Sequence, residues 1–62
     1  QQKVPLKSAL YNLQGLVAYD LKDNAGAKTA FEAAIKIMPE YEYALQSLSA
    51  VNMLLEKENN KK

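Results

Sequence analysis

Residues 24–39, NAGAKTAFEAAIKIMP, carry the clearest helical pattern of the 62-residue chain. Asn24 is a good helix N-cap, because its side-chain oxygen can accept a hydrogen bond from an unpaired backbone N–H. Pro39 disfavours helical geometry at Met38, so it predicts the end of the helix. Between these two residues, apolar side chains recur at steps of three and four, which places them on one helical face. They are Ala27, Ala30, Phe31, Ala34, Ile35 and Met38.

A further helix is predicted on each side of this one. Residues 6–21 hold apolar side chains close to helical spacing, at Leu6, Leu10, Leu13, Val17 and Leu21. Residues 40–57 hold a second such stripe, at Ala44, Leu45, Leu48, Val51 and Leu55. The links are only about two and three residues long, and short links place consecutive helices antiparallel. The predicted fold class is therefore all-α, an antiparallel helical hairpin plus a third helix. At the start of the first helix, either Ser8 is the cap or Pro5 occupies the first turn.

The composition argues against several classes of function. The chain has no Cys and no His, and its eight basic side chains are all Lys. Without Cys and His there is no Ser-His-Asp or Cys-His nucleophile pair and no zinc site based on those ligands. A net charge of +1 without arginine disfavours nucleic-acid binding, which usually relies on a basic stripe. No apolar run approaches the roughly 18 residues of a membrane span.

Acids and hydroxyls are the remaining candidates for chemistry. Asp20 and Asp23 are three residues apart, and Glu40 and Glu42 flank Tyr41. Such carboxylates can bind a divalent cation or transfer protons, but we interpret these four as solvated acids at helix ends. Ser47 and Ser49 have no lysine within one helical turn, and Lys7 adjoins Ser8 without facing it. These hydroxyls and that of Thr29 are therefore assigned to caps and the surface. We therefore expect a protein that is not an enzyme and that has no metal site and no cofactor.

The first and third predicted helices look like two copies of one unit. Pro39 lies 34 residues after Pro5. The same offset aligns Val17 with Val51, Leu21 with Leu55, Gly15 with Ser49, Tyr11 with Leu45 and Asn12 with Gln46. An internal period of this length is typical of helical repeat proteins.

The spacing resembles the tetratricopeptide repeat family, whose helix-turn-helix units have a period of 34 residues. In that family the first helix carries a bulky and then a small residue. The second helix carries Ala, an aromatic residue and Ala, and a Pro follows. The matching residues here are Tyr11, Gly15, Ala27, Phe31, Ala34 and Pro39. The resemblance implies that Gly15 and Ala27 let two helices approach closely while Phe31 fills the wedge between them.

The resemblance also divides the chain. Residues 8–41 would form one complete repeat, and residues 42–57 the first helix of the next repeat or a capping helix. Residues 1–7 would end a preceding unit or form a leader, and residues 58–62 are a polar tail expected to fray. About one and a half repeats would make a fragment of a right-handed superhelical array. Gln1 stands where an initiator Met would be, and no apolar segment of a signal peptide follows. The missing Met suggests that the chain is processed or excised from a longer one, and in that case the missing signal peptide says nothing about the compartment of the parent.

In the resembling family, peptides lie against the first helices of successive repeats, on the concave face of the array. This implies a protein–protein interaction module that binds a peptide or a partner helix. The expected contact residues are Asn12, Leu16, Tyr19, Tyr43, Gln46 and Met53. The competing interpretation is that these side chains pack against neighbouring repeats or face solvent.

An alternative function is structural. Tyr41, Tyr43, Met53 and Leu54 add apolar surface to the third helix beyond what one hairpin can bury. Contiguous exposed apolar area usually marks an interface. On this interpretation the chain is a capping or homo-oligomerisation segment that uses its third helix. Its partner is then a second copy or neighbouring repeats of a longer chain.

Overall fold

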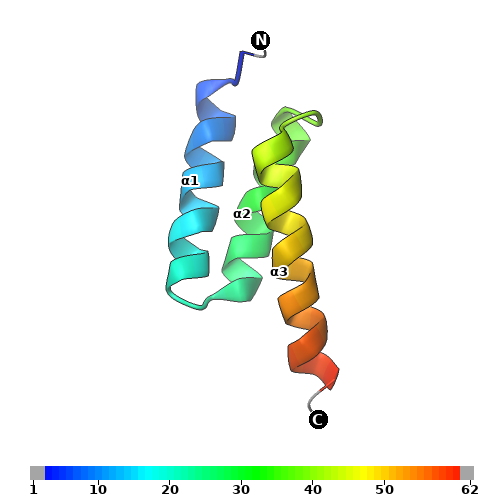
Figure 1. The fold of residues 1–62 in the computed structure, drawn as a ribbon. Helices are drawn as coiled ribbons and strands as arrows, with labels where there is room; N and C mark the ends of the chain where they lie inside the picture. The colour runs from blue at the N-terminus through cyan, green and yellow to red at the C-terminus, as the bar shows by residue number, and fades with distance from the viewer. Residues whose placement is uncertain (1–2, 61–62) are drawn as a thin grey trace.

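The computed structural model describes residues 3–60, which form three α-helices joined by two short turns (Figure 1). Helix α1 spans Leu6–Asp20, α2 spans Asn24–Ile37 and α3 spans Glu42–Asn60. The all-α prediction is confirmed, and the helices lie where the apolar periodicity places them. Residues 1–2 of the predicted leader and residues 61–62 of the predicted tail lie outside the described part of the chain.

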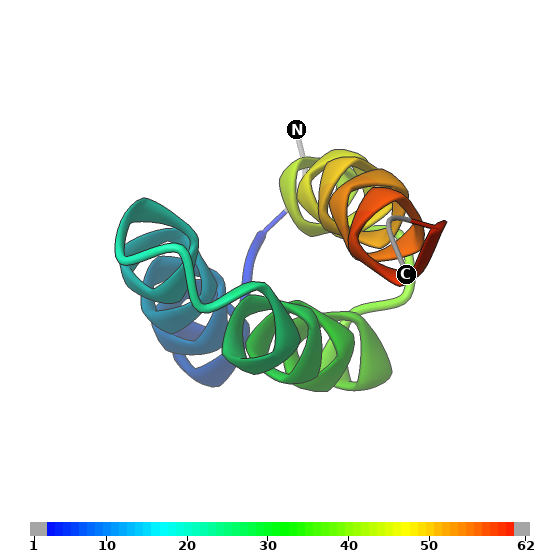
Figure 2. The same ribbon diagram turned by 90° about the horizontal axis from the view of Figure 1, so that it is seen from below.

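Helix α2 is the centre of the arrangement. It packs along α1 on one side and along α3 on the other, whereas α1 and α3 touch at only a few points. Figure 2 looks along the helices and shows them as an arc, with α2 between the other two. The molecule is accordingly elongated, with principal extents of 42 × 19 × 15 Å.

The ends of α2 show one prediction that is right and one that is wrong. Met38 has an extended backbone, with φ −134° and ψ 90°, so the helix ends before Pro39 as predicted. Asn24 is not the N-cap; it is the first helical residue, and its amide Nδ2 donates to Glu58 Oε2 at 2.9 Å. The cap is Asp23, whose carboxylate accepts a hydrogen bond from the Gly26 N–H at 3.0 Å. Asp23 and Asn24 are both good capping residues, and Asp23 is the cap because the helix begins at Asn24.

The start of α1 also differs from one prediction. Pro5 is the N-cap residue, and no side chain caps this end. Ser8 is fully buried, and its hydroxyl donates to the Ala34 carbonyl oxygen at 3.3 Å. The small hydroxyl therefore joins α1 to α2 instead of capping α1. At the other end of the chain, α3 continues to Asn60, so the described part of the polar tail is helical.

The turn between α1 and α2 holds a left-handed residue. Lys22 has φ 63°, and its N–H donates to the Tyr19 carbonyl oxygen at 3.0 Å. The N–H of Asp23 reaches back to the Ala18 carbonyl oxygen at 2.8 Å. This pair of bonds is the Schellman motif, in which glycine is the usual residue at the left-handed position. A lysine there carries a steric cost.

Replacing Lys22 by glycine should therefore stabilise the fold. A side chain in the left-handed region costs about 1–2 kcal/mol, and the extra freedom of unfolded glycine offsets about 0.5–1 kcal/mol of the gain. A net gain of about 0.5–1 kcal/mol should raise the melting temperature by about 2–8 °C. Circular-dichroism melts at one fixed protein concentration measure it. Lys22→Ala is the control, since it removes the charge but keeps the Cβ, and a gain equal to that of glycine would contradict the explanation.

The core depends on a close approach between α1 and α2. Gly15 is buried, and a Cβ added to it would lie 2.5 Å from Phe31 Cε1. The aromatic ring therefore rests directly against the backbone of α1. Phe31 packs with Ala27 and Val51 in one buried cluster. A second buried cluster continues along α2 into α3 and contains Ala34, Met38, Tyr41 and Ala44.

Gly15→Ala should destabilise the protein, although the same change stabilises an ordinary exposed helix by about 0.5–1 kcal/mol. The added methyl group must displace the Phe31 ring, and overpacking of this kind costs about 1–3 kcal/mol. A lowered melting temperature at fixed concentration is the expected result. Ser49→Ala, at the exposed counterpart position in α3, should change stability by less than about 0.5 kcal/mol. A rise in melting temperature for Gly15→Ala would show that the ring does not occupy this position.

The apolar stripe that predicts α1 does not face the core. The buried residues of α1 are Ser8 and Gly15, whereas the stripe residues are between 49% and 75% exposed. They are Leu6, Leu10, Leu13, Val17 and Leu21. Because only small side chains fit against α2, the bulky residues of α1 lie on its other sides. The pattern thus located the helix correctly without showing which face it buries.

Candidate functional site

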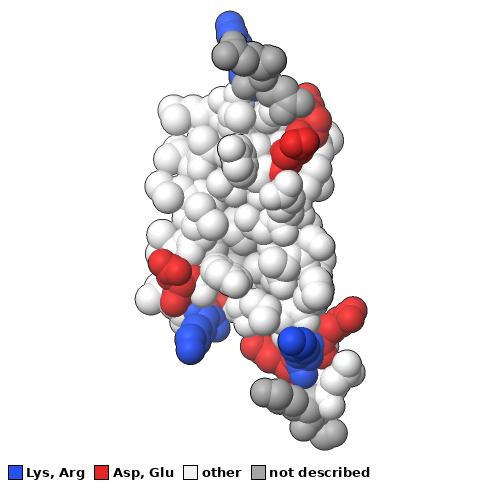
Figure 3. Space-filling model, viewed as in Figure 1, with Lys and Arg blue, Asp and Glu red and all other residues white. Residues whose placement is uncertain are grey.

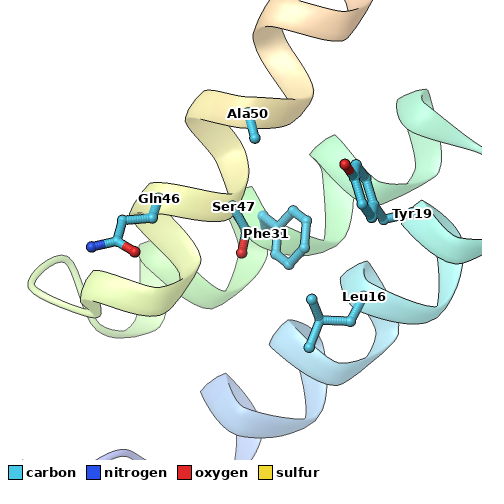
Figure 4. Close-up of a pocket in the computed structure, with 6 residues that line it drawn as sticks. All are labelled: Leu16, Tyr19, Phe31, Gln46, Ser47 and Ala50. Carbon is cyan, nitrogen blue, oxygen red and sulfur yellow. The ribbon is translucent and has the colours of Figure 1, made fainter.

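A cavity of about 250 Å³ lies between α1 and α3. Helix α1 contributes Leu16 and Tyr19, and α2 contributes Phe31. Helix α3 contributes Gln46, Ser47 and Ala50. Figure 4 shows the Phe31 ring between the side chains from α1 and those from α3. The cavity therefore joins all three helices and forms only when they pack.

The chemistry of this cavity is that of an apolar pocket with a few polar groups. Phe31 is fully buried and is held in place by its contact with Gly15. Leu16 and Tyr19 are both 43% exposed, so the α1 wall of the cavity is accessible from solvent. The Gln46 amide and the hydroxyls of Ser47 and Tyr19 can donate and accept hydrogen bonds. Sites of this composition bind apolar groups and orient them through a few polar contacts.

Three of the six residues expected at the concave face meet in this cavity. Leu16, Tyr19 and Gln46 line it together. Asn12 lies one helical turn before Leu16, and its Oδ1 is buried without a hydrogen-bond partner among the described residues. Tyr43 and Met53 line neither this cavity nor the one described below, and they are 74% and 64% exposed. Tyr43 instead makes an edge-to-face contact with Tyr41, at 6.4 Å between ring centroids.

Sequence reasoning did not assign three of the lining residues to this surface as contact residues. Phe31 was expected only to fill the wedge between helices, and Ser47 was expected on the surface. Ala50 matches Leu16 at the 34-residue offset and was placed on this face by that match, but it was not among the expected contact residues. Gln46, Ser47 and Ala50 share one side of α3, and that spacing is the signal that could have found them. It does not by itself tell which side of α3 faces α1.

The residues expected to pack the repeat have mixed environments. Gly15, Ala27, Phe31 and Ala34 are buried, as a close helix crossing requires. Tyr11 is 36% exposed, and Pro39 is exposed in the turn between α2 and α3. Of the apolar residues expected to exceed the needs of the hairpin, Tyr41 is buried and Leu54 half-buried.

A second cavity, of about 410 Å³, lies near the turn between α1 and α2. Tyr19, Leu54 and four polar residues line it: Asp20, Lys22, Asn24 and Glu58. The hydrogen bond between Asn24 and Glu58 spans it from α2 to α3.

Within residues 3–60, no group of three or more His, Cys, Asp or Glu side chains is placed to hold a metal ion. Over the same residues, none of the helices has the length and hydropathy of a membrane span.

On one face of the molecule, charged side chains gather toward the two ends. In Figure 3 the Lys, Asp and Glu residues on the visible face lie at the top and bottom, and the middle is uncharged.

Comparisons of the chain with protein-family models, with curated proteins and with solved structures found no match. The function is therefore argued from the geometry of the site.

Proposed function

We propose that this chain is a protein–protein interaction module that binds a peptide or a helix of a partner between α1 and α3. The observation that carries the proposal is the 250 Å³ cavity lined by Leu16, Tyr19 and Phe31 on one side and by α3 on the other. An apolar cavity of about 150 Å³ is enough to hold benzene. The cavity thus has room for one large apolar side chain, which would anchor the partner.

A tetratricopeptide-like arrangement is part of this proposal. The 34-residue offset between α1 and α3 supports it, as does the contact of Phe31 with Gly15. In such an arrangement the inner side of the arc is the concave face, and the cavity lies on it. The Gln46 amide and the Ser47 hydroxyl would then hydrogen-bond the backbone of the bound segment, which fixes its register.

Selection from a library of 12-residue peptides on the immobilised chain tests the proposal. The selected peptides should share one large apolar residue, because a single such side chain fills the cavity. Tyr19→Ala should weaken the best peptide about fivefold or more, since truncating a central interface aromatic typically costs over about 1 kcal/mol. Isothermal titration calorimetry provides the affinities.

Met53→Ala is the matched control, because Met53 is an exposed apolar residue outside the cavity. It should leave the affinity unchanged, and both variants should keep the helical circular-dichroism signal of the parent chain. Equal losses in the two variants, or no loss in Tyr19→Ala, would overturn the assignment of the site to this cavity.

A further inference from the structure

The outward side of α1 carries an apolar seam, which we define as Leu6, Leu10, Leu13 and Val17. All four residues are exposed, Leu13 by 56%. At about 100° per residue, the seam lies about 180° around the helix from the buried residues Ser8 and Gly15. It therefore faces away from α2. It is also separate from the cavity, none of whose lining residues belongs to it.

The internal repeat shows that this face is one that a helix can cover. Leu10 and Val17 of the seam correspond, 34 residues later, to Ala44 and Val51. Both counterparts are buried, because α3 packs that side against α2. In the described part of the chain, no element precedes α1 that could cover the seam. The counterparts of Leu6 and Leu13 are Glu40, which is exposed, and Ser47, which is half-buried. Half of the seam thus has a buried counterpart on α3 and is open on α1.

We propose that a second copy of this chain covers the seam, with the two α1 helices antiparallel about a two-fold axis. The four residues are spaced by four, three and four positions, and this order reads the same in both directions. Antiparallel pairing therefore aligns Leu6 with Val17 of the other copy and Leu10 with Leu13. Alternating steps of three and four are the spacing by which helices pack knobs into holes.

The charges of α1 favour the antiparallel direction. Lys7 and Asp20 are the only charged residues within α1, one near each end, and Lys3 precedes the helix. Antiparallel pairing places the lysine end of one α1 beside the Asp20 end of the other. Parallel pairing would place the lysines of both copies together, and like charges at close range repel. Between Lys7 and Asp20 the interface would contain no charge to desolvate.

The chain exposes more surface than a compact monomer of its mass. It exposes 4797 Å², whereas a compact monomer of 6.9 kDa exposes about 4,000 Å². The excess of about 800 Å² belongs to the whole elongated chain, and an interface of standard size buries about the same area on each partner. Much of the exposed bulky apolar surface belongs to α1.

The other end of the arc disfavours an open chain of copies. The side of α3 opposite its buried residues is formed by Glu42, Ser49, Met53 and Glu56, all exposed and only one of them apolar. Stacking of α1 on α3 of the next copy would bury these polar groups. A face that pairs with itself gives a closed two-fold dimer instead. The proposal does not rest on the peptide-binding function, because it uses a different side of α1.

Sedimentation equilibrium on the parent chain, Leu13→Glu and Met53→Glu tests the dimer. The parent chain should reach dimer mass, and its melting temperature should rise with concentration. Leu13→Glu should weaken dimerisation about a hundredfold or more, because each dimer loses two buried leucines and gains two charges. Its helical signal at low concentration should persist, since Leu13 does not belong to the core. The Met53→Glu chain, which is changed at an exposed position of α3, should still dimerise.

Two outcomes would overturn the proposal. One is monomer mass for the parent chain at every concentration up to about 1 mM. The other is dissociation by Met53→Glu with no effect of Leu13→Glu, which would assign the interface to α3. Loss of peptide binding in Tyr19→Ala tests the proposed function separately, because Tyr19 lies outside the seam.

Engineered cysteines test the direction of the pairing, and the chain has none of its own. An equal mixture of Leu6→Cys and Val17→Cys chains, oxidised under mild conditions, should form mainly the mixed disulfide. Mass spectrometry distinguishes it from the two symmetric products. Parallel helices would instead place each cysteine beside its own counterpart. A predominance of symmetric disulfides would therefore overturn the antiparallel arrangement.

Discussion

The contact between the Phe31 ring and the backbone at Gly15 is the constraint on which the other features depend. It brings α1 and α2 so close that only small side chains such as Ser8 and Gly15 fit on the inner side of α1. The bulky residues of α1 must then point elsewhere. Leu16 and Tyr19 face the cavity, and the seam residues face outward. One close approach thus produces both the candidate binding surface and the candidate dimer surface.

Helices α1 and α3 show how the same pattern acquires different roles. The 34-residue offset aligns Val17 with Val51, yet Val17 is exposed and Val51 is buried. The difference arises because α2 precedes α3 and covers that side of it, while no described element precedes α1. Apolar burial is the main favourable term in folding and association. The exposed apolar residues of the seam on α1 can therefore still stabilise an assembly by becoming buried, whereas their counterparts on α3 that pack against α2 are already buried.

The candidate site could be predicted only in part. Periodicity placed Leu16 and Tyr19 on one side of α1, and the internal repeat pointed to Gln46. Ser47 was not predicted, because the rotation of α3 about its axis depends on how Tyr41, Ala44 and Val51 pack against α2. Tyr43 and Met53 satisfied the same spacing but lie away from the cavity. A periodic pattern defines the sides of a helix without telling which neighbour each one meets.

Local chemistry in the sequence was enough to predict three helices, their approximate ends and the break at Pro39, because these features depend on residues within one or two turns of each other. The burial of Ser8 against Ala34 and the hydrogen bond from Asn24 to Glu58 depended on longer-range geometry. So did the outward direction of the α1 stripe. Which face of a helix becomes buried depends on the volume of its side chains as well as on their hydropathy. The space between α1 and the Phe31 ring holds a glycine but has no room for a leucine.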